Sequence, residues 1–210
     1  MNFHFINQLE YTHIPYYTSL DFGGLPEEKN NIAYSGCGLC CFVMGIEACT
    51  GKRIKLEEAV RLSEKYAANR HHGTDLEILF QHSARDYGLD FQMTNHSGVL
   101  RKWLEDGGIA VANPSGNRDG YVCPFCDRGH YLFVYALKGN VCTVYDTAWK
   151  EGKFDSAVKD GSVKLHHDNT LETTLEVLDE ACLTKNPRYC LVKKCSNYLE
   201  PVVKNNVKEL

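Results

Sequence analysis

Ser35-Gly36-Cys37-Gly38-Leu39-Cys40 is the stretch that decides the fold, and it opens an apolar segment that ends near Cys49. The pattern predicts a helix from about Gly38 to Cys49, stopped by Thr50-Gly51. A helix N-terminus carries partial positive charge and unpaired N–H groups, and both stabilise a thiolate. Cys37, at the predicted helix start, is therefore a candidate nucleophile.

Two further polar residues lie far downstream on strand-like segments. His130 opens the segment 130–137 and Asp146 closes the segment 141–146, with a turn between them that predicts a hairpin. An imidazole can take the proton of a thiol and return it to a leaving group, and a third group fixes the imidazole tautomer. Cys37, His130 and Asp146 are thus the candidate nucleophile, base and orienting acid. The alternative is that Cys37 and His130 are ordinary core residues.

These motifs resemble, in their order and spacing, the papain-like cysteine peptidases of the bacteriocin-processing (double-glycine) group. The matching segments are Ile14-Pro15-Tyr16-Tyr17, Gly36-Cys37-Gly38, residues 129–134 and Val144-Tyr145-Asp146. The resemblance implies an α+β papain-like fold, with a helical part that carries Cys37 packed on an antiparallel sheet that carries His130 and Asp146. It implies a cysteine peptidase or related acyl-transfer hydrolase that acts on a peptide or amide substrate and needs no cofactor.

The oxyanion position departs from the family pattern. The family carries a Gln just after the Ile-Pro segment, and the matching position here is Ser19. Its hydroxyl, together with the Cys37 N–H, is the implied oxyanion donor, and losing one such donor typically costs about 100- to 1000-fold in turnover. A catalytically silent papain-like domain that binds a peptide or small ligand is therefore the second hypothesis. Gln8 precedes the Ile-Pro segment and is a less favoured donor.

The bulk composition predicts one globular domain over residues 1–198, followed by a mobile tail over residues 199–210. The chain has 210 residues and a formal net charge of -4, which gives no electrostatic basis for binding nucleic acid or an anionic membrane. No apolar run reaches the roughly 18 residues of a membrane span. The N-terminal residues lack the basic and apolar pattern of a signal peptide, so we expect a cytoplasmic protein. The sequence does not indicate an oligomeric state.

Ten cysteines are present, two of them adjacent at Cys40-Cys41, and without an export signal we expect most to be reduced thiols. Cys123-Pro124-Phe125-Cys126 has chemistry of its own, since C-x-x-C can be a redox pair or half of a zinc site. No second C-x-x-C supplies the missing zinc ligands. Plain loop thiols are the favoured interpretation, and we expect no metal; a metal site at Cys123 and Cys126 and a redox pair are the alternatives.

The remaining elements follow from periodicity, caps and breakers. We expect helices over residues 56–68, 74–87 (with Thr74 as N-cap), 99–105 and 171–182, and strands over residues 91–93, 109–112 and 189–193. Residues 113–129 form a long connection rich in Gly, Pro and Asp. A structureless loop of this length favours a functional role beside the candidate site.

Overall fold

The computed structural model describes residues 3–18, 26–70 and 73–196, and in these ranges a mixed sheet-and-helix architecture is present. The main sheet has seven strands in the order β3-β9-β4-β5-β6-β8-β7, and every neighbouring pair is antiparallel. The strands are β3 (Leu89–Thr94), β4 (Ile109–Ala112), β5 (Leu132–Lys138), β6 (Val141–Asp146), β7 (Lys164–Leu165), β8 (Leu171–Thr174) and β9 (Tyr189–Lys194).

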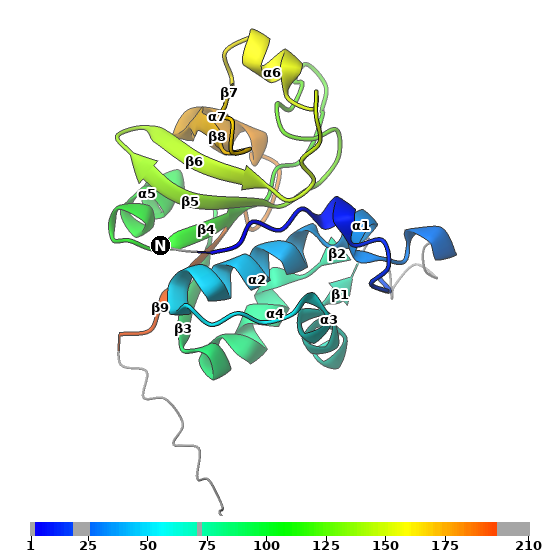
Figure 1. The fold of residues 1–210 in the computed structure, drawn as a ribbon. Coiled ribbons are helices and arrows are strands. Elements are labelled where there is room, and N and C mark those ends of the chain that lie inside the picture. Colours follow the sequence, from blue (N-terminus) through cyan, green and yellow to red (C-terminus); the bar gives the residue numbers. More distant parts are fainter. Residues whose placement is uncertain (1–2, 19–25, 71–72, 197–210) are drawn as a thin grey trace, which may run out of the picture.

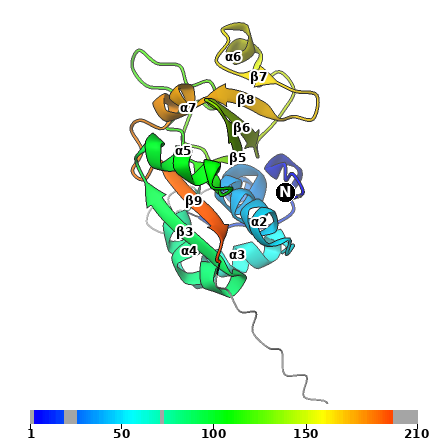
Figure 2. The same ribbon diagram turned by 90° about the vertical axis from the view of Figure 1, so that its left-hand side faces the viewer.

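The helices cover both faces of this sheet, as Figures 1 and 2 show. In Figure 1, α2, α3 and α4 gather in the lower half, while α5 and α7 lie in the upper half with β4, β5 and β6. The helices are α1 (Ile32–Ser35), α2 (Cys37–Thr50), α3 (Leu56–Lys65), α4 (Leu76–Ser83), α5 (Ser97–Glu105), α6 (Asp155–Lys159) and α7 (Leu175–Ala181). Three short 3-10 helices, η1 (Gln8–Glu10), η2 (Glu27–Lys29) and η3 (Ala84–Tyr87), and a two-stranded ribbon, β1 (Asn69–Arg70) and β2 (Gly73–Thr74), complete the described elements.

The alternation of side chains along the central strands builds two hydrophobic cores. In β4, Ile109 and Val111 pack with the α2 side, whereas Ala110 and Ala112 pack with the α5 and α7 side. Successive side chains of a strand point to opposite faces, so a strand that is apolar at every position is buried on both. The expected α+β class, with a helical part packed on an antiparallel sheet, is confirmed.

Helix α2 (Cys37–Thr50) is the central helix of the first core, and it confirms the predicted helix. Eleven of its fourteen residues are buried, including Gly38 and Glu47 at its two ends. A helix that is apolar all round has no solvent face and must lie inside the protein. The chain leaves the helix at Gly51, whose φ of 73° is readily reached by glycine.

The segment around Ile14 and Tyr16 lies beside the residues that precede α2. The Ile32 N–H donates to the Ile14 carbonyl at 3.1 Å, and the Tyr16 N–H donates to the Asn30 carbonyl at 3.0 Å. The buried Tyr16 hydroxyl also bonds to Thr74 Oγ1 at 2.8 Å. These contacts hold the start of α2 against β2.

Two predicted elements need correction. The N-cap of α4 is Asp75, whose Oδ1 accepts from the Ile78 N–H at 3.0 Å, and not Thr74, because the Thr74 hydroxyl is bonded to Tyr16. The helix also ends at Ser83, where a 3-10 turn takes over.

Residues 171–182 are not one helix. Leu171–Thr174 is strand β8, in which Leu171 and Thr173 are buried in alternation, and only then does Thr174 cap helix α7. Pairing with β6 is the tertiary contact that overrides the helical pattern at these four positions.

The remaining predicted helices and strands lie within a few residues of their expected bounds, and residues 113–131 contain neither helix nor ladder strand. None of the helices in the described ranges is long and apolar enough to cross a membrane. The tail predicted over residues 199–210 lies outside the described residues.

Candidate functional site

Cys37 is the first residue of α2, and two glycines let other segments approach it closely. A Cβ on Gly36 would lie 2.5 Å from the Ile32 carbonyl oxygen, and a Cβ on Gly38 would lie 2.8 Å from the Cβ of Thr74. Both distances are too short for any side chain, so only glycine allows α1 and β2 to pack here. The Cys37 thiol is left half-buried at the wall of a cavity.

His130 lines the same cavity as Cys37 and lies near the end of the loop over residues 113–131. The backbone N–H of His130 donates to the Pro114 carbonyl at 3.2 Å, which ties together the two ends of this loop. His130 lies two residues before β5 begins at Leu132, so it is a loop residue and not the strand residue that we predicted. Asp146, as predicted, is in β6, where it is the last residue and is paired in register with Leu132.

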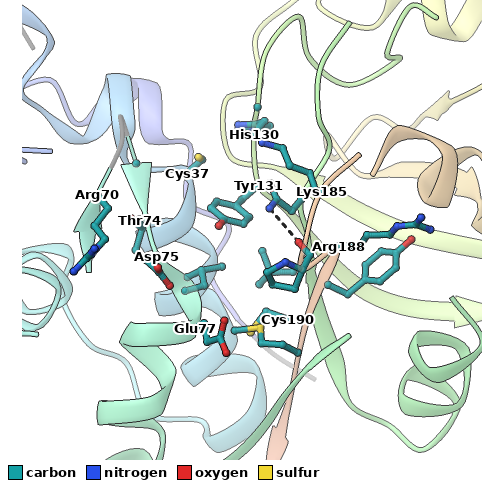
Figure 3. Close-up of a pocket in the computed structure, with 18 of the residues that line it drawn as sticks. Cys37, Arg70, Thr74, Asp75, Glu77, His130, Tyr131, Lys185, Arg188 and Cys190 are labelled. Carbon is teal, nitrogen blue, oxygen red and sulfur yellow. Dashed lines mark hydrogen bonds between the residues drawn. The ribbon is translucent and has the colours of Figure 1, made fainter. Parts of the chain in front are cut away.

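The imidazole of His130 lies between a carboxylate and the cavity that Cys37 lines. Its Nε2 lies 2.7 Å from Asp146 Oδ1, and both His130 and Cys37 line the cavity. Because Asp146 occupies Nε2, Nδ1 is the nitrogen left for the thiol. Figure 3 shows Cys37 on the helical side of the cavity and His130 on the side of the long loop.

The electrostatics of the group favour a thiolate beside an imidazolium. Burial alone would raise the pKa of Cys37, but the hydrogen bond and charge of His130 and the N–H groups of Tyr131 and Gly38 outweigh it and lower that pKa. For His130, burial disfavours the charged form, yet the charge and hydrogen bond of Asp146 raise its pKa to about 9. A lowered thiol pKa and a raised imidazole pKa are what proton transfer from Cys37 to His130 requires.

Asp146 is fully buried and has more than one partner. Its Oδ1 also accepts from the Ala148 N–H at 2.7 Å, and its Oδ2 is ion-paired with Lys153 Nζ. Burial raises the pKa of this carboxyl, but His130 and Lys153 lower it to about 2. Sequence reasoning missed Lys153, since a single lysine in a loop seven residues after Asp146 carries no motif that would single it out.

The cavity beside these residues has a volume of about 850 Å³, within the usual range of roughly 300–1,000 Å³ for ligand sites. Cys37 and His130 open into it. In Figure 3 the acidic side chains of Asp75 and Glu77 lie on the α4 side, and Lys185 lies on the opposite side. The cavity therefore offers groups of both charge signs to an extended ligand.

The predicted oxyanion position, Ser19, lies outside the described residues. Gln8, the less favoured donor, is buried and its side chain serves other contacts: Nε2 donates to the Ala33 carbonyl at 2.9 Å, and Oε1 accepts from Thr147 Oγ1 at 2.9 Å. These bonds tie η1 to α1 and to the end of β6. Gln8 is thereby a structural residue beside the site.

The C-x-x-C pair lies in the loop that leads to His130. All ten cysteines are free thiols, and Cys123 Sγ lies 3.9 Å from Cys126 Sγ. In the ranges that the structure describes, no three His, Cys, Asp or Glu side chains come together in a way that could hold a metal ion. Among the described residues, Cys123 and Cys126 therefore have no further protein ligands that would complete a zinc site.

Comparisons with known proteins found similarity among solved structures alone. No family model matches the chain, and no curated protein matches it. Among solved structures, the chain is similar to the peptidase domain of Streptococcus ComA, a bi-functional ABC transporter involved in a quorum sensing pathway. The two share 12% identity with a TM-score of 0.45, over 74% of this chain and 88% of that one. At this level of similarity the function has to be argued from the site itself.

Proposed function

We propose that this chain is a cysteine peptidase, or a related acyl-transfer hydrolase, that cleaves peptide or amide bonds. The observation that carries the proposal is the place of His130, whose Nε2 lies 2.7 Å from Asp146 Oδ1 and which lines one cavity together with Cys37. A nucleophile, a base and a residue that orients the base are the minimum set for this chemistry.

In the proposed reaction the Cys37 thiolate attacks the carbonyl carbon, and the His130 imidazolium returns its proton to the leaving amine. Water then attacks the thioester, with neutral His130 as general base, and Cys37 is released. Asp146 holds the imidazole by its Nε2 and stabilises the imidazolium without taking its proton. The Cys37 N–H, with Ser19, is the proposed donor set for the oxyanion.

Alkylation with a chloroacetamide or iodoacetamide at neutral pH tests the nucleophile. Cys37 and Cys49 lie at opposite ends of α2, both are half-buried, and one tryptic peptide over residues 30–52 contains them. Burial raises the pKa of Cys49 to about 12, whereas that of Cys37 is lowered. Cys49 is therefore a matched internal control, and fragmentation of the peptide assigns the label.

We expect Cys37 to be alkylated at least about tenfold faster than Cys49, and His130→Ala to remove most of that advantage at neutral pH. Hydrolysis of a mixed peptide library, abolished by Cys37→Ala, would then show the reaction itself. Equal labelling of Cys37 and Cys49 would contradict an activated thiol.

The second candidate is a silent domain that binds a peptide or small ligand, and the serine at the family's glutamine position favours it. We expect weak turnover of simple peptides and an increase with Ser19→Gln. If Cys37 is readily alkylated while neither the natural chain nor Ser19→Gln hydrolyses any peptide, the binding function is the better account.

A further inference from the structure

The loop over residues 113–131 holds a pair of thiols that the proposed reaction does not use. Cys123 is buried, Cys126 is half-buried, and their sulfur atoms lie 3.9 Å apart. The pair lies in the wall of a second cavity, of about 810 Å³, which Lys153 and His130 also line. His130 lines both cavities, so the dithiol adjoins the candidate active site.

We propose that Cys123 and Cys126 form a redox-active dithiol that exchanges with low-molecular-weight disulfides of the glutathione type. The site alternates between the dithiol and an intramolecular disulfide. This inference does not rest on the proposed peptidase function, because it uses neither Cys37 nor the ionisation of His130.

The backbone around the pair brings the two sulfurs together in advance. Asn117 Oδ1 accepts from the Cys123 N–H at 2.8 Å, and Asn117 Nδ2 donates to Asp127 Oδ1 at 3.1 Å. The Asn117 N–H also donates to the Asp127 carbonyl at 3.1 Å. Asn117 therefore bonds to the residues on both sides of the C-x-x-C turn and fixes its backbone. A disulfide bond is about 2.05 Å long, so the sulfurs need to close by about 2 Å, which side-chain rotation can supply.

The two thiols are not equivalent. The two sulfurs share a hydrogen bond in which either could be the donor. The interaction with Cys126 lowers the pKa of Cys123, and the N–H groups of Phe125, Cys126 and Gly116 lower it further, although burial opposes this. The hydrogen bond to Cys123, burial and the charge of the Cys123 thiolate raise the pKa of Cys126. Cys123 is therefore the attacking thiolate and Cys126 the resolving thiol.

The exchange balances in two steps. The Cys123 thiolate attacks one sulfur of the small disulfide, whose S–S bond breaks and releases one thiolate; Cys123 is left in a mixed disulfide. The Cys126 thiol then loses its proton to water or to the released thiolate and attacks Cys123 Sγ. That step releases the second small thiol and forms the Cys123–Cys126 bond, so the protein loses two electrons and the small disulfide gains two.

The second cavity gives the small disulfide a route to the pair. Its volume lies within the range of roughly 300–1,000 Å³ that holds small ligands. Arg128 and Lys150 line it together with the two cysteines, and Asp127 and Glu151 line it as well. The cavity therefore offers cationic groups to the carboxylates of a glutathione-type molecule and acidic groups to its amine. Val122, next to Cys123, is 81% exposed, which places this turn at the protein surface.

Digestion with trypsin provides a direct test on the full chain. The peptide of residues 119–128 lies between Arg118 and Gly129 and contains Cys123 and Cys126 but none of the other cysteines. The protein is incubated with glutathione disulfide, quenched with acid, alkylated and mapped. We expect this peptide to lack two hydrogens and to escape alkylation, and we expect reduced glutathione to restore the dithiol.

Two serine variants separate the two steps. In Cys126→Ser the resolving thiol is missing, so Cys123 should accumulate as a glutathione mixed disulfide. In Cys123→Ser the attacking thiolate is missing, so Cys126 should react at least about tenfold more slowly than Cys123 does in the first variant. Circular dichroism checks that both variants are folded.

Two results would overturn the proposal. One is a peptide of residues 119–128 that remains a dithiol in excess glutathione disulfide, with no adduct on Cys123 in Cys126→Ser. The other is one equivalent of zinc that copurifies with the chain and is lost in both serine variants, which would make the pair a metal site. Neither result bears on alkylation of Cys37, so failure here and failure of the peptidase proposal are distinguishable.

Discussion

Lys153 is ion-paired with Asp146 through the carboxylate oxygen that His130 leaves free. The Lys153 ammonium also donates to the Ala148 carbonyl at 3.3 Å, and its side chain is only 16% exposed. His130 and Lys153 therefore share one buried carboxylate. Because Lys153 contacts the carboxylate that holds His130, it is a positioning residue that acts on the imidazole through Asp146.

We expect a bell-shaped dependence of kcat/KM on pH. The acid limb reports ionisation of the Cys37 thiol and should lie below the usual thiol range, because its pKa is lowered. The alkaline limb reports loss of the His130 proton and should lie near pH 9. In Asp146→Asn the charge that raises the His130 pKa is gone, so the alkaline limb should move to lower pH. An unmoved limb would contradict the role of Asp146.

Removing Lys153 should move the same limb in the opposite direction. In Lys153→Met the Asp146 carboxylate no longer faces a second cation, so its attraction for the His130 imidazolium increases and the His130 pKa rises. Lys153→Arg, which keeps the charge, is the matched control and should leave the limb in place. A merely structural role for Lys153 would lower activity in Lys153→Met without shifting the pH profile, and pH–rate profiles of the three proteins decide between these cases.

The buried ion pair should also give the fold a characteristic pH dependence. The Asp146 pKa is lowered to about 2, so its contribution is present above the unfolded value of about 3.9 and is lost as the pH falls toward 2. The His130 pKa is raised to about 9, so its contribution is present below about 6.5 and is lost as the pH rises through 9. Both contributions are complete only between about pH 4 and 6.5.

In that window Asp146→Asn should lose about 2 to 3 kcal/mol of the free energy of unfolding, and the loss should shrink on either side. Thermal unfolding of both proteins at a series of pH values measures it. A Tm difference that is constant from pH 3 to 9 would show that Asp146 is not ionised and paired in the folded chain.

Gly38 should not tolerate a side chain, whereas Gly45 on the same helix should. In Gly38→Ala the new Cβ would lie 2.8 Å from the Thr74 Cβ and 3.2 Å from Tyr131, so β2 or the His130 loop must shift. In Gly45→Ala the nearest atom is 3.6 Å away. We expect Gly38→Ala to destabilise by about 1 to 3 kcal/mol and Gly45→Ala to stabilise by up to about 1 kcal/mol.

Alkylation of Cys37 gives this pair of variants a second readout. A Cβ on Gly38 would displace Tyr131, whose N–H helps to lower the pKa of Cys37, so Gly38→Ala should also slow alkylation of Cys37. Gly45→Ala should leave that rate unchanged. Equal stability and equal alkylation in the two variants would contradict the close packing at the start of α2.

The sequence by itself determined the elements whose signals are local. The run from Gly38 to Cys49 is apolar at every position except Glu47 and is followed by Thr50-Gly51, so neighbouring residues were enough to predict a helix. The strands β5 and β6 are adjacent in sequence and joined by a short turn, so their pairing followed from neighbouring residues. The order of the motifs also predicted Cys37, His130 and Asp146 as one group.

Only the tertiary structure decided the contacts that join distant residues or depend on them. Thr74 and Asp75 are both suitable N-cap residues for α4. Asp75 caps the helix because the Thr74 hydroxyl is bonded to the hydroxyl of Tyr16, which is far away in sequence. Lys153 gave no periodic signal, and its position follows from the path of the loop after β6. Local preferences extend over a few residues, whereas a buried charge selects its partners from whatever the packed chain brings within reach.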